Sequence, residues 1–272
     1  MTPQITLIKK YDSNPLLSKR ISLDEHGALL SDGSHCLLIQ GTATRAAAAT
    51  AADLAKIIGA CCSDEAIALG ALKDGLPNSV PITVPGRLRG SPGAVTRSRA
   101  FIDYRPGIPA WVLIDFDTKG LPTNVSARIE AAGGAWKALM TVAPGLARAT
   151  RVSRASTSSG LFLSDTGERL PGSTGAHHYV LLRDGGDAER FLKDLHDRCW
   201  LDRFGWHMIG GAGQLLDRSL VDRMVGYGER LCFEGAPLVV PPLAQDTAKR
   251  VPEVFDGEAI DSGLTVPGLT EY

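Results

Sequence analysis

Residues 110–117 read AWVLIDFD, an apolar run that ends in two alternating carboxylates. Successive side chains of a β-strand point to opposite faces, so Asp115 and Asp117 share one face while Ile114 and Phe116 share the other. Two carboxylates at one strand end repel each other, and a divalent cation that prefers oxygen ligands, such as Mg²⁺ or Mn²⁺, relieves that repulsion. The stretch therefore predicts a metal site at the edge of a sheet.

Charge is spread unevenly along the chain. Its 272 residues carry a formal net charge of −1, so the molecule is long enough for a substantial core and is no polycation as a whole. Two stretches hold basic but no acidic residues, namely residues 75–102 with Arg97 and Arg99, and residues 131–164 with Arg151 and Arg154. Local basic stretches beside a carboxylate pair suit a polyanion that is handled at a metal site.

The five cysteines show no C-x₂-C pairing, which argues against a structural zinc site. Their odd, scattered number is typical of a reducing compartment, and we expect a cytoplasmic protein. The N-terminus has no apolar core of a signal peptide, and no run of 18 apolar residues occurs, so we expect no membrane partner.

Strand-like and helix-like segments are mixed without a regular βαβ order, which favours an α+β fold. We expect strands at residues 35–40, 110–115, 149–154, 160–163 and 177–182, and helices at 41–60, 124–132, 187–198 and 215–225. An irregular connector is expected over residues 75–107. Residues 251–272 contain acids, prolines and glycines, and we expect them to form a tail or linker.

Three further segments carry side chains that suit phosphate and metal. Residues 156–160, STSSG, form a hydroxyl-rich turn, and residues 172–180, GSTGAHHYV, put His177 at the start of a strand behind a glycine turn. In residues 216–222, LDRSLVD, Arg218 and Asp222 are four apart, on one side of the expected helix. Taken singly, each segment also fits a surface turn, a strand histidine or an ordinary helix ion pair.

Three motifs, taken in their order along the chain, resemble the archaeo-eukaryotic primase superfamily. They are an hhhhDhD strand, in which h is an apolar residue, the Gly175-Ala176-His177 motif that opens a strand, and Val221-Asp222. The chain is most similar to the primase-polymerases of phages, plasmids and other mobile elements. Residues 156–161, STSSGL, and residues 229–235, ERLCFEG, resemble accessory segments of such proteins. The resemblance covers residues 111–245, about half of the chain.

The resemblance implies a catalytic core at residues 1–250. An N-terminal α/β unit, about residues 1–105, would pack on an RRM-like catalytic unit, about residues 106–250, with the active site in the cleft between them. It also implies template-dependent nucleotidyl transfer from ribo- or deoxyribonucleoside triphosphates on single-stranded DNA with a primer. A helicase, in the same chain or a separate one, is a possible partner.

The resemblance also implies roles for single residues. Asp115, Asp117 and Asp222 would bind two Mg²⁺ or Mn²⁺ ions, with Asp217 as another possible third carboxylate. His177 would contact the triphosphate of the incoming nucleotide. The remaining expected contacts are Ser158, Ser159 and Arg218 with phosphate, and Arg97, Arg99, Arg151 and Arg154 with DNA.

Two other functions stay open at this point. An apolar strand that ends in D-x-D also opens haloacid-dehalogenase phosphatases, but the Thr or Val usual four residues after the first Asp is Lys119 here. A replication-initiation module that binds single-stranded DNA with an inactive site would be the non-enzymatic alternative. A requirement for Mg²⁺ or Mn²⁺ separates catalysis from simple DNA binding.

Overall fold

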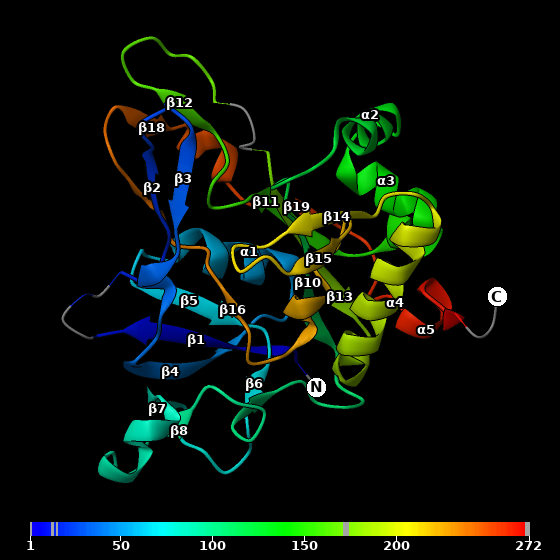
Figure 1. Ribbon diagram of the computed structural model, residues 1–272. Coiled ribbons are helices and arrows are strands. Elements are labelled where there is room, and N and C mark those ends of the chain that lie inside the picture. Colours follow the sequence, from blue (N-terminus) through cyan, green and yellow to red (C-terminus); the bar gives the residue numbers. More distant parts are fainter. Residues whose placement is uncertain (1, 12–13, 15, 171–173, 270–272) are drawn as a thin grey trace.

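The computed structural model of the chain describes residues 2–11, 14, 16–170 and 174–269. These residues form an α+β fold in which strands and helices are mixed along the chain, as the sequence predicts. Two large sheets lie side by side (Figure 1). Among the described residues, no helix combines the length and apolar character needed to cross a bilayer.

The larger sheet has six strands and comes mainly from the N-terminal part of the chain. Its order is β16-β5-β1-β4-β7-β8, and all neighbours are antiparallel except β7 and β8. Its strands are β1 (Gln4–Lys10), β4 (Gln40–Ala47), β5 (Glu65–Ala68), β7 (Ser79–Thr83), β8 (Val95–Thr96) and β16 (Leu231–Cys232). Because β16 comes from far along the chain, it joins the residues around 231 to the N-terminal sheet.

The second sheet has four antiparallel strands in the order β10-β13-β11-β19. They are β10 (Ala110–Phe116), β11 (Arg151–Ala155), β13 (Ala176–Leu182) and β19 (Glu253–Phe255). The apolar run before the two aspartates thus forms a strand, as predicted. Six of the seven residues of β10 are buried, five of them in an unbroken row from Ala110 to Ile114, which explains why its sequence is a continuous apolar run.

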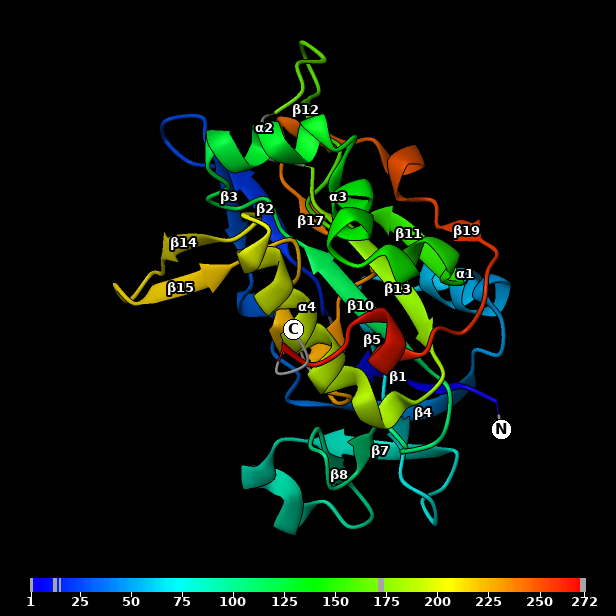
Figure 2. The ribbon, with the colours of Figure 1, turned by 90° about the vertical axis from the view of Figure 1, so that its right-hand side faces the viewer.

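Helices cover the two faces of the four-stranded sheet differently. The helices are α1 (Ala51–Ala60), α2 (Thr123–Ala131), α3 (Ala135–Val142), α4 (Ala188–Leu201) and α5 (Ser262–Thr265). Figures 1 and 2 show α2, α3 and α4 on the face turned away from the six-stranded sheet. On the other face α1 contacts β11 and β19. A capping box starts α1, because the Thr50 hydroxyl accepts from the Asp53 amide at 3.1 Å and Asp53 accepts from the Thr50 amide at 3.0 Å.

One hydrophobic cluster joins the two sheets. Ile5 of β1, Leu54 of α1 and Trp111 of β10 all belong to it, and none of these side chains is exposed. The Trp111 indole Nε1 also donates a hydrogen bond to the carbonyl of Ala48 at 2.7 Å. The apolar contact and the hydrogen bond together fix β10 against the N-terminal part of the chain.

Small sheets and a hairpin complete the fold. The small sheets pair β2 (Arg20–Leu23) with β3 (Leu29–Asp32) and β17 (Leu238–Val239), β6 (Ala71–Leu72) with β9 (Ile102–Asp103), and β12 (Leu161–Leu163) with β18 (Leu243–Gln245). The hairpin consists of β14 (Trp206–Ile209) and β15 (Leu215–Arg218). Figure 2 shows this hairpin extending from the body of the molecule.

The helix predicted for residues 41–60 is wrong in its first half. Residues 40–47 form β4 between β1 and β7, and only residues 51–60 are helical. A Cβ added to Gly41 would lie 2.3 Å from the carbonyl oxygen of Lys9, so β1 approaches here more closely than any other residue would permit. Strand pairing therefore overrides the helical propensity of the alanine-rich run.

The helix predicted for residues 215–225 is also wrong. Residues 215–218 pair with residues 206–209, and the glycine-rich stretch between them is the hairpin turn, with Gly213 at a φ of 79°. A short 3₁₀ helix, η5 (Arg223–Gly226), follows. The apolar spacing that suggested one helix comes instead from a strand and a 3₁₀ turn placed end to end.

Three further differences concern predicted irregular segments and a short strand. The strand predicted for residues 35–40 begins only at Gln40, after a 3₁₀ turn at Ser34–Cys36. The predicted connector at 75–107 contains β7, β8 and β9. In the predicted tail, β19 pairs with β11, so residues 253–255 protect the edge of a sheet and are no linker. The other predicted strands and helices are confirmed within a few residues, and α3 was not predicted.

Candidate active site

The end of β10 brings the first aspartate beside the predicted histidine. In the antiparallel register Asp115 pairs with His177 of β13, and His177 pairs with Arg154 of β11. Directly opposed residues share a face, so the three side chains form a row across the sheet. His177 Nε2 lies 3.6 Å from Asp115 Oδ1.

Glu234, just after β16, completes this row with a buried carboxylate. Its side chain has 0% exposure. It accepts hydrogen bonds from His177 Nδ1 at 2.5 Å, from Arg154 Nη1 at 2.9 Å and from the Tyr179 hydroxyl. A buried carboxylate without such partners would be strongly destabilising, so Glu234 depends on this network.

The neighbouring charges decide the protonation of His177. Burial alone would lower its pKa, but the carboxylates of Glu234 and Asp115 and the hydrogen bond to Glu234 raise it above the ordinary value. Burial alone would raise the pKa of Glu234, but the charge and hydrogen bond of His177, the charge of Arg154 and the hydrogen bond of Tyr179 lower it. The imidazole is thus favoured in its charged form, with Nδ1 donating to Glu234 and the Nε2 proton directed toward Asp115.

The three predicted aspartates act on one another. Burial is the largest cause of the raised pKa of Asp115, and the negative charges of Asp222 and Asp117 add to it while His177 opposes it. The backbone amide of Asp222 donates to the carbonyl of Asp115 at 3.1 Å, which holds the segment before η5 against the edge of β10. A divalent cation at this point would favour the ionised form of all three carboxylates.

Arg218 lies between two of these aspartates. Its Nη2 is 3.3 Å from Asp117 Oδ2, and its Nη1 is 4.0 Å from Asp222 Oδ2. The sequence therefore placed Arg218 and Asp222 together correctly, although the element that carries Arg218 is a strand and not the predicted helix. Its guanidinium partly offsets the negative charge of the carboxylates.

Asp217, the alternative third carboxylate, has other partners. Its Oδ2 lies 2.8 Å from Arg223 Nη2 and 3.3 Å from His196 Nε2. Asp217 and Arg218 are neighbours on β15, so their side chains point to opposite faces of the hairpin. Asp222, which is bonded to β10 through its backbone, is the better candidate for the third ligand.

A cavity of about 410 Å³ opens over the carboxylates. Such a volume lies within the range of roughly 300–1,000 Å³ that small-molecule sites occupy. Its charged lining comprises Asp115, Asp117, Asp217, Asp222, Arg218, Arg223 and Arg230. A phosphorylated ligand that carries a divalent cation matches a cavity with both signs of charge.

The donor set suits Mg²⁺ or Mn²⁺, because both prefer carboxylate oxygens. In the described part of the chain, however, the three aspartates do not bring an oxygen each within 4.8 Å of one another. Side-chain rotation or bridging water is therefore needed for one cation to contact all three, and Mg²⁺ commonly keeps several waters. Cys62, Asp64 and Glu65 do approach that closely, but Lys9 Nζ already lies 3.3 Å from Asp64 and 3.7 Å from Glu65.

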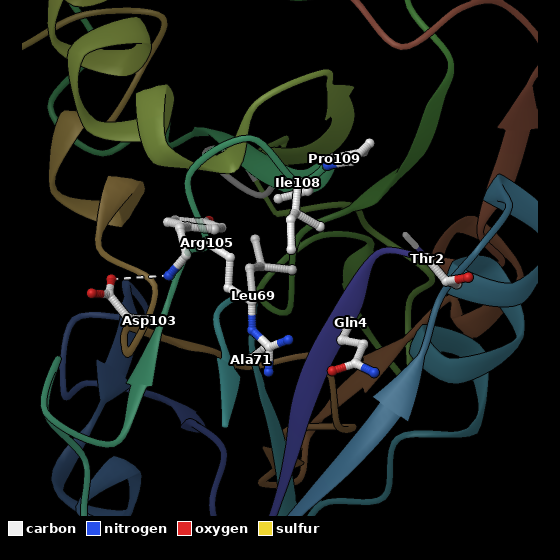
Figure 3. A pocket seen from close by; sticks show the side chains of 10 residues that line it. Thr2, Gln4, Leu69, Ala71, Asp103, Arg105, Ile108 and Pro109 are labelled. Atoms are coloured by element: carbon white, nitrogen blue, oxygen red, sulfur yellow. Dashed lines mark hydrogen bonds between the residues drawn. The ribbon is translucent and has the colours of Figure 1, made fainter. Parts of the chain in front are cut away.

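A second cavity, of about 240 Å³, lies at the opposite end of β10 (Figure 3). Ala110, the first residue of β10, lines it, whereas the aspartates lie at the end of the strand. Its two charged side chains already have partners, because Arg105 Nη2 lies 2.8 Å from Asp74 and Asp103 lies 3.3 Å from Lys73 Nζ. This cavity is therefore separate from the aspartate site and offers no uncompensated charge.

The predicted serines lie in the turn that precedes the histidine strand. The Ser159 hydroxyl is buried and donates to the carbonyl of Gly175 at 2.8 Å, while Ser158 is half-buried. Ser159 thus holds the chain just before His177 in place. Its hydroxyl is engaged with the backbone, which makes it a poorer phosphate donor than the sequence suggested.

Three of the four arginines predicted to contact DNA are engaged within the protein. Arg154 is buried against Glu234, which makes the prediction of a DNA contact wrong for this residue. Arg151 stacks on the rings of Trp136 and Phe255, at 4.4 and 3.6 Å. Arg99 forms an ion pair with Glu189. Within the described residues Arg97 makes no ion pair.

Two candidate residues were missed by sequence reasoning. Glu234 lies in the accessory segment 229–235, in which the resemblance implies no role for a single residue. Lys19 immediately precedes β2, and it is near enough for its charge to lower the pKa of both Asp115 and His177. No sequence signal marks Lys19, because only the fold brings it to the site.

Comparisons with models of protein families, with curated proteins and with solved structures give no match to this chain.

Proposed function

We propose that this protein is a DNA primase-polymerase of the archaeo-eukaryotic primase type. The observation that supports this most is that Asp115, which pairs with His177 and through it with Glu234, lies beside Asp117 and Asp222 at one cavity. The two sheets that share one core support the finer fold proposal, an N-terminal unit packed on an RRM-like catalytic unit. The substrates would be nucleoside triphosphates and a single-stranded DNA template with a primer.

Each residue has a role in this proposal. Asp115, Asp117 and Asp222 would hold two Mg²⁺ or Mn²⁺ ions, which activate a 3′-hydroxyl and stabilise the leaving pyrophosphate when bound. His177 donates its Nε2 proton to a phosphate oxygen, and Glu234 keeps the imidazolium charged and oriented. Arg218 is a second donor to phosphate, since its planar guanidinium suits that geometry.

The test is incorporation of labelled nucleotides on single-stranded DNA, with and without a primer, in Mg²⁺ or Mn²⁺. We expect metal-dependent product that Asp115→Ala/Asp117→Ala lowers by more than about 100-fold, because loss of residues that merely support metal ligands already costs about 10–100-fold. The unprimed reaction shows whether this chain also starts strands.

Asp217→Ala is the matched control, because it also removes a carboxylate from this cavity. The carboxylate of Asp217 is already paired with Arg223 and His196. It should leave most of the incorporation intact. Absence of product from every reaction, with DNA binding retained, would refute the polymerase and favour the inactive binding module. Release of phosphate from a small phosphoester, lost in the Asp115 variant, would instead favour the phosphatase.

A further inference from the structure

One of the arginines that line the aspartate cavity differs from the others. Arg218 contacts Asp117, and Arg223 contacts Asp217. Arg230 is exposed and, within the part of the chain that the structure describes, makes no ion pair. Its charge is therefore available at the cavity wall.

Arg97 lies next to Arg230 although the two are far apart in sequence. Arg97 belongs to the loop between β8 and β9, and its Nη1 donates to the backbone carbonyl of Glu229 at 3.2 Å. Partial burial lowers the pKa of Arg97, and the positive charge of Arg230 lowers it further, while the Glu229 carboxylate opposes them. Two guanidinium groups that repel each other are stabilised when an anion binds between them.

The position of the pair indicates which anion binds. Arg230 lines the cavity, whereas Arg97 lies outside it on a loop of the N-terminal part. In the proposed function the nucleotide would occupy the cavity, whose lining includes Arg218. A nucleic acid strand, by contrast, has to enter and leave, and it carries a negative charge at every phosphodiester.

We infer that Arg230 and Arg97 form a phosphate-binding path by which a single DNA strand leaves the aspartate cavity. The assignment to DNA rests on the proposed function, whereas the binding of phosphate rests on the two charges alone. Arg99, two residues from Arg97, takes no part in the path because Glu189 neutralises it.

The experiment is fluorescence anisotropy of a labelled oligothymidylate at a series of salt concentrations, without metal or nucleotide. For the Arg97→Ala/Arg230→Ala double variant we expect severalfold weaker binding at low salt. We also expect the slope of log affinity against log salt to fall by about 0.7 for each arginine removed. Arg99→Ala is the matched control, with the same substitution on the same loop, and should bind like the parent.

A parallel titration with a fluorescent nucleoside triphosphate and Mg²⁺ separates the two sources of phosphate. We expect the double variant to keep the parental nucleotide affinity. Weaker nucleotide binding with unchanged DNA binding would overturn the strand path and assign the pair to the triphosphate, and unchanged binding of both would overturn the phosphate site itself. A parent protein without polymerase activity whose DNA binding still depends on both arginines would refute the proposed function and keep this inference.

Discussion

The two faces of the four-stranded sheet treat adjacent histidines in opposite ways. His177 lies between Glu234 and Asp115, and its pKa is raised even though burial alone would lower it. His178 points to the helical face, where its ring lies 5.1 Å from that of Trp136 and its Nδ1 lies 2.8 Å from the Ser153 hydroxyl. Burial, aided by the charges of Arg151 and His177, lowers the pKa of His178 to about 3.

Both histidines are 8% exposed, so the extent of burial does not explain the difference. What differs is the partner, which is a buried carboxylate on one face and an aromatic ring with a hydroxyl on the other. One strand thus presents a histidine that favours its charged form to the candidate active site and a neutral ring to the helical face of the sheet. The comparison predicts that changes to the charged network affect stability and activity, whereas changes at His178 affect only the dependence of stability on pH.

The largest expected effect is that of Arg154→Met on stability. Breaking a buried ion pair by removing one partner costs about 3–5 kcal/mol, because the other charge stays buried. Arg154 also donates to the carbonyl of Ile58 in α1, so the substitution also loosens a contact between the four-stranded sheet and this helix. Urea denaturation measures the loss in the free energy of unfolding.

The control for this variant is Arg183→Met, which makes the same chemical change in an exposed pair with Glu258 at 3.4 Å. Exposed pairs contribute about 0–1 kcal/mol, so this variant should unfold nearly like the parent. Equal losses for the two variants would contradict a special role for the buried network.

The next effect is that of Glu234→Gln on the proposed polymerase. An amide keeps the size of the side chain but removes the charge that favours the imidazolium, and loss of such supporting groups costs about 10–100-fold in activity. We expect a lower kcat/KM for nucleotide, a pH profile shifted toward acid, and unchanged affinity for single-stranded DNA.

Tyr179→Phe provides the comparison, because it removes one hydrogen bond to Glu234 and leaves the negative charge. Its activity should fall much less, and its pH profile should stay in place. If both variants lost activity equally without a shift in the pH profile, Glu234 would have a structural role only.

The smallest effect concerns His178→Gln at mildly acidic pH. The folded-state pKa of His178 is about 3, below its ordinary value of 6.5, so the unfolded chain takes up the proton first as the pH falls. The stability is fully present above pH 6.5 and is lost as the pH falls toward 3. From pH 7 to 5.5 this loss amounts to about 1 kcal/mol.

The glutamine variant should lose less stability than the parent over this interval, while the exposed-site control His26→Gln should lose as much as the parent. Thermal unfolding at both pH values provides the measurement. Identical pH dependence in parent and His178→Gln would show that this ring takes up its proton without opposing folding.

The sequence predicts those parts of the site that depend on neighbours along the chain. The alternation at Asp115 and Asp117 needs only the period of a strand, and the glycine turn before His177 is local too. Arg154 shows the limit of such reasoning, because the stretch around it contains no acid while its partner Glu234 lies 80 residues away. Charge balance along the sequence is therefore no guide to charge balance in space.

The same limit applies to secondary structure. Residues 40–47 have helix-forming alanines, but β1 and β7 provide hydrogen-bonding partners on both sides. Residues 215–218 have a spacing that fits a helix, but the preceding glycines turn them back onto β14. In both cases a partner that is distant in sequence or a tight turn decides the structure, and neither is visible in local periodicity.

The two-residue strand β16 has a consequence for deletion mapping. A fragment that ended before Glu234 would retain all three aspartates, His177 and Arg218, and would look complete when judged by its motifs. It would nevertheless lose the anion that compensates His177 and Arg154, leaving two buried cations side by side. Because β19 and the buried residues Ile260 and Val266 also follow Glu234 in the chain, substitution at position 234, and not truncation, isolates the loss of this one side chain.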